Sequence, residues 1–192
     1  MREREEKMKL NVLTPEHPDI PAVKALYEQA FPANERGMSM DAIVANMDKM
    51  PIRLFGIYTD EAEKDFAGFL LAIEGEKFVY LVFLAILPEK RSGGLGSQVL
   101  NAMREYYAGT PLVFSYESIY EESDNAEQRE RRRNLYLKLG FHETGWFAKL
   151  NGTEFIIASS EPEIDADVFM QYMRAMAAGN PDAKIPELYR RD

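Results

Sequence analysis

The sequence contains no cysteine. This absence excludes disulfides, thiolate metal sites and a cysteine nucleophile, and it fits a reducing compartment. Histidine is nearly as scarce, because only His17 and His142 are present and they lie far apart in the chain. A histidine metal site or a Ser/His/Asp triad is therefore poorly supplied, and we expect no metal cofactor.

Long apolar runs and an excess of positive charge are also missing. No apolar run can cross a bilayer, and residues 1–7 are charged rather than the start of a signal peptide, so we expect a cytoplasmic protein without a membrane partner. The net charge of −9 disfavours nucleic acid and favours a cationic partner such as an amine. The length of 192 residues predicts a single domain spanning residues 1–192.

Hydrophobic periodicity predicts a mixed α/β fold with at least one parallel crossover. Strands are expected at residues 9–13, 53–58, 66–73, 78–87, 112–119, 141–150 and 154–159, and helices at 20–31, 41–50, 97–107, 127–139 and 165–178. The last two strands form a hairpin around Asn151-Gly152, which is a strong turn signal. Residues 78–87 are apolar throughout, which predicts a strand buried on both faces.

A glycine-rich loop follows that apolar strand and leads directly into a helix. Gly93, Gly94 and Gly96 let backbone N–H groups turn outward, and the helix N-terminus adds unpaired donors and partial positive charge. Such a loop suits a phosphate or pyrophosphate, with Arg91 adding positive charge at its mouth. No Gly-Lys-Ser/Thr follows, and Val99 occupies the third glycine position of the dinucleotide fingerprint, so neither common phosphate motif is present. The alternative is a glycine-rich turn that only caps the helix.

Two segments resemble signatures of the GCN5-related N-acetyltransferases (GNAT). Residues 91–96, Arg-Ser-Gly-Gly-Leu-Gly, match the family's Arg/Gln-x-x-Gly-x-Gly/Ala loop, and the preceding residues 84–88 resemble its Leu-Ala-Val-x-Pro strand end. Residues 135–141 are similar to its Leu-Tyr-x-Lys-x-Gly-Phe block. The resemblance covers residues 8–160, leaving residues 161–192 as a further C-terminal helix and tail. It implies a GNAT-like fold with a central, mostly antiparallel sheet, a parallel splayed pair and helices on both faces.

The resemblance also implies a cofactor and an activity. Acetyl-CoA would be the co-substrate, and its acetyl group would pass to a primary amine of a small molecule or peptide by direct attack on the thioester. The backbone of the strand end would contact the pantetheine arm, and the loop amides would hold the pyrophosphate. The residues implied in CoA binding are Ala85, Ile86, Arg91, Ser92, Gly93, Gly94, Leu95, Gly96 and Ser97.

Catalytic roles are less well defined by the motifs. Tyr136 matches the family's usual acid beside the thioester sulfur, with a core tyrosine as the alternative. Many relatives carry a basic glutamate on the strand before the loop, but residues 78–87 contain none. Glu117 on the next strand is the best carboxylate for a base, against a structural ion pair or an exposed strand end. Tyr80 is a weaker candidate, and Glu35 could bind the acceptor ammonium group or lie in a solvated turn.

Three questions stay open at this level. A basic cluster before Tyr136 could reach the CoA phosphates, or form a solvated helix face balanced by Glu127 and Glu130; its members are Arg129, Arg131, Arg132 and Arg133. The C-terminal helix and tail either pack on the sheet or cover a second subunit in a homodimer. Two functions compete with acetyl transfer: a non-catalytic acyl-CoA-binding sensor on the same fold, and a phosphate-binding structural domain unrelated to CoA.

Overall fold

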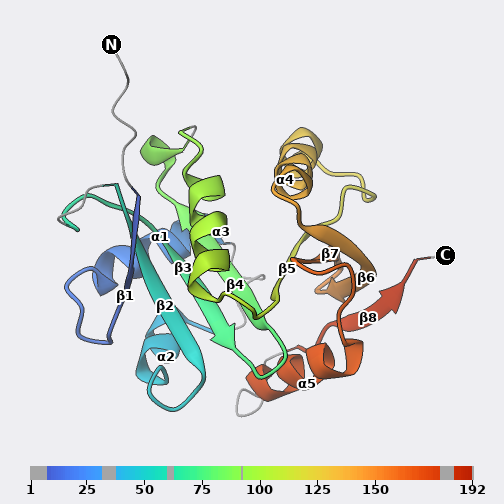
Figure 1. The fold of residues 1–192 in the computed structure, drawn as a ribbon, viewed down its shortest axis with the longest axis horizontal. Helices are drawn as coiled ribbons and strands as arrows, with labels where there is room; N and C mark the ends of the chain where they lie inside the picture. The colour runs from blue at the N-terminus through green and yellow to red at the C-terminus, as the bar shows by residue number, and fades with distance from the viewer. Residues whose placement is uncertain (1–7, 32–37, 60–62, 92, 178–183, 192) are drawn as a thin grey trace. The chain divides into compact units, whose positions relative to one another are not determined.

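The computed structural model describes residues 8–31, 38–59, 63–91, 93–177 and 184–191 (Figure 1). Its elements are β1 (Lys9–Val12), α1 (Ile20–Ala30), α2 (Met40–Ala45), β2 (Ile52–Tyr58), β3 (Phe66–Glu74), β4 (Val79–Ile86), η1 (Pro88–Lys90), α3 (Leu95–Tyr106), β5 (Leu112–Glu117), α4 (Ala126–Lys138), β6 (His142–Leu150), β7 (Thr153–Ser159), α5 (Ala166–Ala177) and β8 (Glu187–Arg190). Hydrogen-bonded neighbours follow the order β1-β2-β3-β4-β5-β7-β6-β8. One strand pair is parallel and the rest are antiparallel, which confirms the predicted mixed α/β fold class.

The chain divides into two compact units. The first contains residues 1–33, 39–74 and 81–108, and the second contains residues 34–38, 75–80 and 109–192. Each unit has its own helices, whereas β4 contributes residues 79–80 to the second unit and residues 81–86 to the first. The expected single domain over residues 1–192 stays a prediction.

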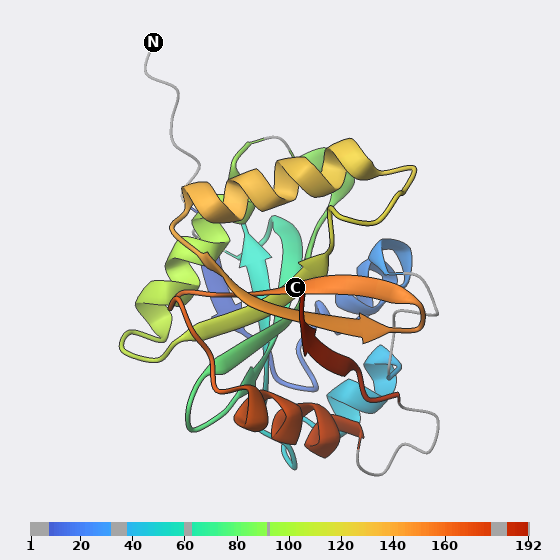
Figure 2. The same ribbon diagram turned by 90° about the vertical axis from the view of Figure 1, so that its right-hand side faces the viewer.

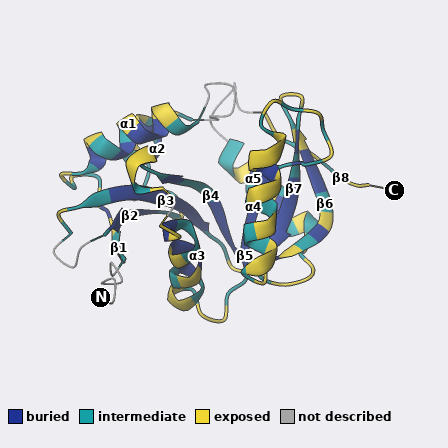
Figure 3. Cartoon of the chain, turned by 90° about the horizontal axis from the view of Figure 1, so that it is seen from above, coloured by how far each residue is buried: buried dark blue, intermediate teal, exposed yellow. Residues whose placement is uncertain are grey.

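The first unit is a sheet of β1, β2, β3 and most of β4 with helices on both faces (Figure 3). Phe69 of β3 meets Tyr27 of α1 with ring centroids 6.3 Å apart. Phe55 of β2 meets Tyr106 of α3 at 5.1 Å. Phe69 pairs with Gly56, the neighbour of Phe55, so the two phenylalanines point to opposite faces. Helix α1 therefore covers one face of this sheet and α3 covers the other.

In the second unit, α4 and α5 lie on opposite sides of β5, β7 and β6 (Figure 2). Tyr136 of α4 packs against Phe114 with ring centroids 4.8 Å apart. Phe169 of α5 packs edge-on against Tyr80, at 5.5 Å. The C-terminal helix therefore packs on the sheet of its own chain, the first of the two alternatives. The tail beyond it forms β8 on the edge of β6, which the sequence patterns did not predict.

The predicted second helix, 41–50, is much shorter in the structure, because Asn46 ends it. The Asn46 backbone amide returns to the carbonyls of Ile43 and Val44, and its side-chain amide donates to the Ala42 carbonyl at 2.8 Å. Pro51 further disfavours helical backbone just before it. The prediction was too long because the helical spacing of apolar residues continues beyond Asn46, although the hydrogen bonds of Asn46 end the helix there.

Exposure along β4 differs from the prediction that the strand is buried on both faces. Val79, Tyr80 and Leu81 are buried, but residues 82–84 are only half-buried, although all are apolar. An apolar strand centre that stays partly open is the kind of surface that a ligand can cover. The backbone beyond it is tightly packed, because a Cβ placed on Gly68 of β3 would lie 2.2 Å from the Ala85 carbonyl oxygen.

That close approach makes Gly68 intolerant of any side chain. We expect Gly68→Ala to destabilise the protein by about 3 kcal/mol, since backbone must move to admit the methyl group. Gly96→Ala is the matched control: its Cβ would meet only the Ile86 Cδ1 atom, at 3.7 Å, within the first turn of α3. It should raise stability by about 0.5 kcal/mol through helix propensity. Urea unfolding of both variants measures the contrast, and equal stabilities would contradict it.

Candidate active site

The glycine-rich loop joins β4 to α3 and exposes backbone donors. Gly94 is the N-cap of α3 in the left-handed conformation, with φ 72° and ψ 10°. The amides of Ser97 and Gln98 donate to the Gly94 carbonyl at 3.0 and 3.2 Å. Among the described residues, none accepts a hydrogen bond from the amides of Gly94, Leu95 or Gly96. Helix α3 therefore begins two residues earlier than predicted, with free donors at its start.

The surface of this loop is open. A Cβ placed on Gly93 or Gly94 would have no heavy atom within 4 Å. Arg91 is exposed, and its Nε donates to the Ile86 carbonyl at 2.9 Å, which holds the side chain against the end of β4. Ser92, also expected in CoA binding, lies outside the described residues. Donors, partial positive charge and an open surface together suit an anionic group.

Tyr136, the expected acid, lies on α4 in an aromatic cluster. Its ring is 4.8 Å from Phe114 and 5.0 Å from Tyr116, and the residue is half-buried. Burial raises the pKa of the Tyr136 phenol above its ordinary value, although Arg132 acts in the opposite direction. No described residue hydrogen-bonds to the Tyr136 hydroxyl. The group is therefore protonated at neutral pH and has its proton available to a ligand.

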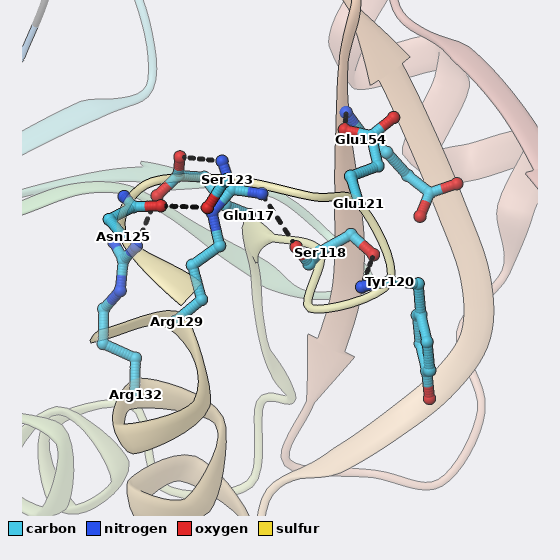
Figure 4. A network of polar contacts seen from close by, with 9 residues as sticks. All are labelled: Glu117, Ser118, Tyr120, Glu121, Ser123, Asn125, Arg129, Arg132 and Glu154. Atoms are coloured by element: carbon cyan, nitrogen blue, oxygen red, sulfur yellow. Dashed lines mark hydrogen bonds and ion pairs between the residues drawn. The ribbon is translucent and has the colours of Figure 1, made fainter. Parts of the chain in front are cut away.

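Glu117, the expected base, is held by two arginines of α4 (Figure 4). Its Oε1 accepts a hydrogen bond from Arg129 Nη2 at 2.8 Å, and its Oε2 accepts one from Arg132 Nη2. Burial disfavours the charged carboxylate, but Arg132 and Arg129 outweigh it and hold the Glu117 pKa below its ordinary value. A carboxylate so stabilised binds a proton weakly. This geometry favours the structural ion pair among the alternatives.

The other arginines before Tyr136 are paired as well. Arg133 forms a two-pronged contact with Glu143 of β6, which also accepts a hydrogen bond from the Tyr116 hydroxyl at 2.6 Å. Arg131 pairs with Glu127 at 3.3 Å on the exposed face of α4. Each arginine of the cluster thus has a carboxylate of its own unit. The sequence did not single out Glu143 as a partner of this cluster, because it lies on β6 whereas Arg133 lies on α4.

We expect Glu117→Ala to destabilise the protein by about 3 kcal/mol, because it leaves buried Arg129 without a counter-charge. The Glu117 pKa is lowered on folding, so this stabilisation is present above the ordinary glutamate pKa of about 4.3 and is lost as pH falls through the lowered value. Glu127→Ala removes an exposed ion pair and should change stability by about 0.5 kcal/mol or less. Denaturant unfolding at pH 7 and pH 3 measures the free energy of unfolding of each variant relative to the wild type. Equal losses of stability in the Glu117 and Glu127 variants at pH 7 would argue against a buried pair.

The other residues expected in the site differ in burial. Tyr80 is 7% exposed, its hydroxyl hydrogen-bonds with the Ser115 hydroxyl at 2.8 Å, and burial raises its pKa. A buried phenol of raised pKa is a poor base. Glu35 lies outside the described residues. Ala85 is buried, whereas Ile86 and Ser97 are half-buried.

No group of three or more histidine, aspartate or glutamate side chains in the described part of the chain is arranged to hold a metal ion. None of the described helices is both long enough and apolar enough to cross a membrane.

Solved structures with this fold include several acetyltransferases. A protein described as a GNAT-family acetyltransferase from Bacteroides thetaiotaomicron matches with a TM-score of 0.65 and 20% identity, over 88% of this chain and 95% of that one. An aminoglycoside 6'-N-acetyltransferase complexed with coenzyme A matches with a TM-score of 0.62 and 18% identity, over 82% and 99%. The spermidine/spermine N-acetyltransferase SpeG from Vibrio cholerae matches with a TM-score of 0.59 and 16% identity, over 80% and 93%. At these identities the likeness concerns the fold.

Sequence comparison supplies the family. No curated protein matches the sequence. The model of the acetyltransferase (GNAT) family matches residues 20–141, which is more than half of the chain and includes both the glycine-rich loop and Tyr136. The resemblance seen in the two motifs is thereby confirmed, and the chain belongs to the GNAT family of acetyltransferases.

Proposed function

We propose that this protein is an N-acetyltransferase that transfers the acetyl group of acetyl-CoA to a primary amine of a small molecule or peptide. The observation that carries the proposal is the start of α3. Gly94 is its left-handed N-cap, and the adjacent amides have no hydrogen-bond partner among the described residues. These donors and the helix dipole fit a pyrophosphate. Arg91 supplies positive charge beside them.

The half-buried apolar centre of β4 supports a place for the pantetheine arm. The arm would cover residues 82–84 and contact the backbone of Ala85 and Ile86. An amide at this strand end would donate a hydrogen bond to the thioester carbonyl, and donors aimed at a developing oxyanion are often the largest catalytic contribution.

In the proposed reaction, the neutral amine attacks the thioester carbonyl carbon, a C–N bond forms and the C–S bond breaks. The Tyr136 hydroxyl donates its proton to the leaving thiolate. The proton of the amine leaves through water rather than to Glu117, because that carboxylate is committed to Arg129 and Arg132. Glu117 then acts by holding α4, and with it Tyr136, in position. Glu35 stays a proposed contact of the acceptor ammonium group.

The pH dependence of the reaction should follow the acceptor. An alkylamine with a pKa near 10 is almost fully protonated at pH 7, so kcat/KM should rise about tenfold per pH unit through the neutral range. Because the pKa of Tyr136 is raised, the acid stays protonated and the rise should continue to about pH 9. Initial rates between pH 6.5 and 9.5 measure this, and a fall above pH 8 would contradict Tyr136 as the acid.

A thiol-release assay tests the proposed function. The protein and acetyl-CoA are incubated together with one acceptor class at a time: polyamines, amino acids, aminoglycosides or short peptides. Binding of acetyl-CoA is followed by thermal shift. We expect stabilisation by acetyl-CoA and acceptor-dependent thiol release with at least one amine class. Tight binding without thiol release for any acceptor would favour the acyl-CoA sensor. Absence of any thermal shift would overturn both readings.

A further inference from the structure

The C-terminal residues of the chain place two arginines over aromatic rings of the second unit. Strand β8 pairs with β6, with Arg190 opposite Trp146 and Tyr189 opposite Phe147. The Arg190 guanidinium lies 4.6 Å from the Trp146 ring centroid. The next residue, Arg191, lies 4.8 Å from the Tyr120 ring centroid and 5.7 Å from that of Phe147.

A buried carboxylate lies beside Arg191. Glu154 of β7 is only 5% exposed, and its Oε2 accepts a hydrogen bond from the Tyr189 hydroxyl. Its Oε1 is buried and accepts no hydrogen bond, and the nearest cation, Arg191 Nη1, is 3.6 Å away. Figure 4 shows Glu154 near Tyr120, which comes from the loop after β5. Burial disfavours the charged form of Glu154, but the hydroxyls of Ser118 and Tyr189 and the nearby Arg191 and Lys149 hold its pKa below the ordinary value.

Arg191 fills this place incompletely. A well-formed guanidinium–carboxylate pair has N–O distances of about 2.7–2.9 Å, and often two of them. The Arg191 side chain is instead 42% exposed and leaves a buried oxygen unsatisfied. Leaving a buried acceptor without a donor costs about 1–3 kcal/mol, which a better-placed cation would recover.

We propose that Glu154, Tyr120 and Phe147 form a binding site for the alkylguanidinium group of a ligand, and that Arg191 occupies this site while the ligand is absent. A flat guanidinium can stack on the two rings and present its N–H groups to the free Oε1 atom, which a compact ammonium group does less well. Tyr120 is 51% exposed, so the site can be reached from solvent. Binding of a guanidinium group at this site requires neither acetyl-CoA nor the proposed transfer reaction.

Calorimetric titration of the full chain with agmatine, in the absence of acetyl-CoA, tests the site. Arg191→Ala removes the competitor, so agmatine should bind about tenfold more tightly than to the wild type. Arg190→Ala is the matched control, because it removes the same charge from the neighbouring position, which has Trp146 but no Glu154 beside it. It should leave the agmatine affinity unchanged. Equal affinities of the Arg191→Ala variant and the wild type would overturn the proposal.

Variants in the Arg191→Ala background test the site's own residues. Glu154→Gln keeps the side-chain shape and an acceptor for Tyr189 but removes the charge, and should weaken agmatine binding at least tenfold. Tyr120→Leu changes an exposed side chain and should weaken binding severalfold even if the Glu154 variant does not fold, which circular dichroism will show. A peptide containing one arginine is titrated in parallel: tighter binding than agmatine identifies a protein ligand, and weaker binding identifies a small molecule. Unchanged affinity in the Tyr120 variant would argue against the site.

Discussion

Gly94→Glu should abolish measurable binding of acetyl-CoA, with a loss of affinity of about a hundredfold or more. The substitution puts a carboxylate among the amides at the start of α3, where the proposal places a pyrophosphate. Two negative groups would then compete for the same donors. A side chain at this position meets no heavy atom within 4 Å of its Cβ, so the folded state should survive. The measurement is calorimetric titration with acetyl-CoA, supported by circular dichroism.

Gly109→Glu is the control for strain and charge. Gly109 is also left-handed, with φ 86°, and its Cβ position is equally open, but it follows the C-terminal end of α3 instead of preceding its start. Both substitutions add one negative charge and cost about 1 kcal/mol in backbone strain. Only the Gly94 variant should lose acetyl-CoA binding. If both variants bind as the wild type does, the loop has no part in holding the cofactor.

Tyr136→Phe should lower kcat by about a hundredfold while leaving the affinity for acetyl-CoA unchanged. The ring contacts with Phe114 and Tyr116 do not depend on the hydroxyl, so packing is kept. We expect the lower end of the usual range for acid catalysis, since a thiolate with a pKa of about 8.5 already leaves well without help. Steady-state kinetics with the best acceptor of the panel, together with titration of acetyl-CoA, separate kcat from binding.

The neighbouring tyrosine provides a matched control. The Tyr116 hydroxyl donates to Glu143 at 2.6 Å, so Tyr116→Phe removes a hydroxyl from the same aromatic cluster at a site with a structural partner. This variant should lose about 1–2 kcal/mol of stability and keep its kcat. If Tyr136→Phe is as active as the wild type, Tyr136 is a core tyrosine and not the acid. In a sensor without turnover, the substitution would likewise have no effect on thiol release.

Several features of the fold could be predicted from residues that act locally. The Asn151-Gly152 turn is confirmed, with φ of 51° and 85°, and Gly140 takes the left-handed conformation that ends α4, with φ 77°. Gly94 likewise adopts a conformation that the loop requires. These positions depend on the backbone preferences of one or two residues, which do not change with distant packing. The order and type of the main elements could be predicted from hydrophobic periodicity, which is also a property of contiguous residues.

Other features depended on distant partners. The helix expected at residues 165–178 is present as α5, but the sequence did not show which of its residues are buried. These are Phe169 and Met173, and the packing face is set by Phe78, which contacts both Phe169 and Tyr172. Strand β8 has too few residues for a periodic pattern, and it forms because β6 offers an edge to pair with.

By itself, the sequence determined the family, the fold class and the glycine-rich loop, because each is written in contiguous residues with defined backbone preferences. Only the tertiary structure decided that Glu117 is bound by Arg129 and Arg132 and that Arg191 lies over Tyr120 beside Glu154. A glutamate looks the same in the sequence whether it belongs to a catalytic site or to a structural ion pair. Its role follows from which charges approach within a few ångströms, and that distance exists only once the chain has folded.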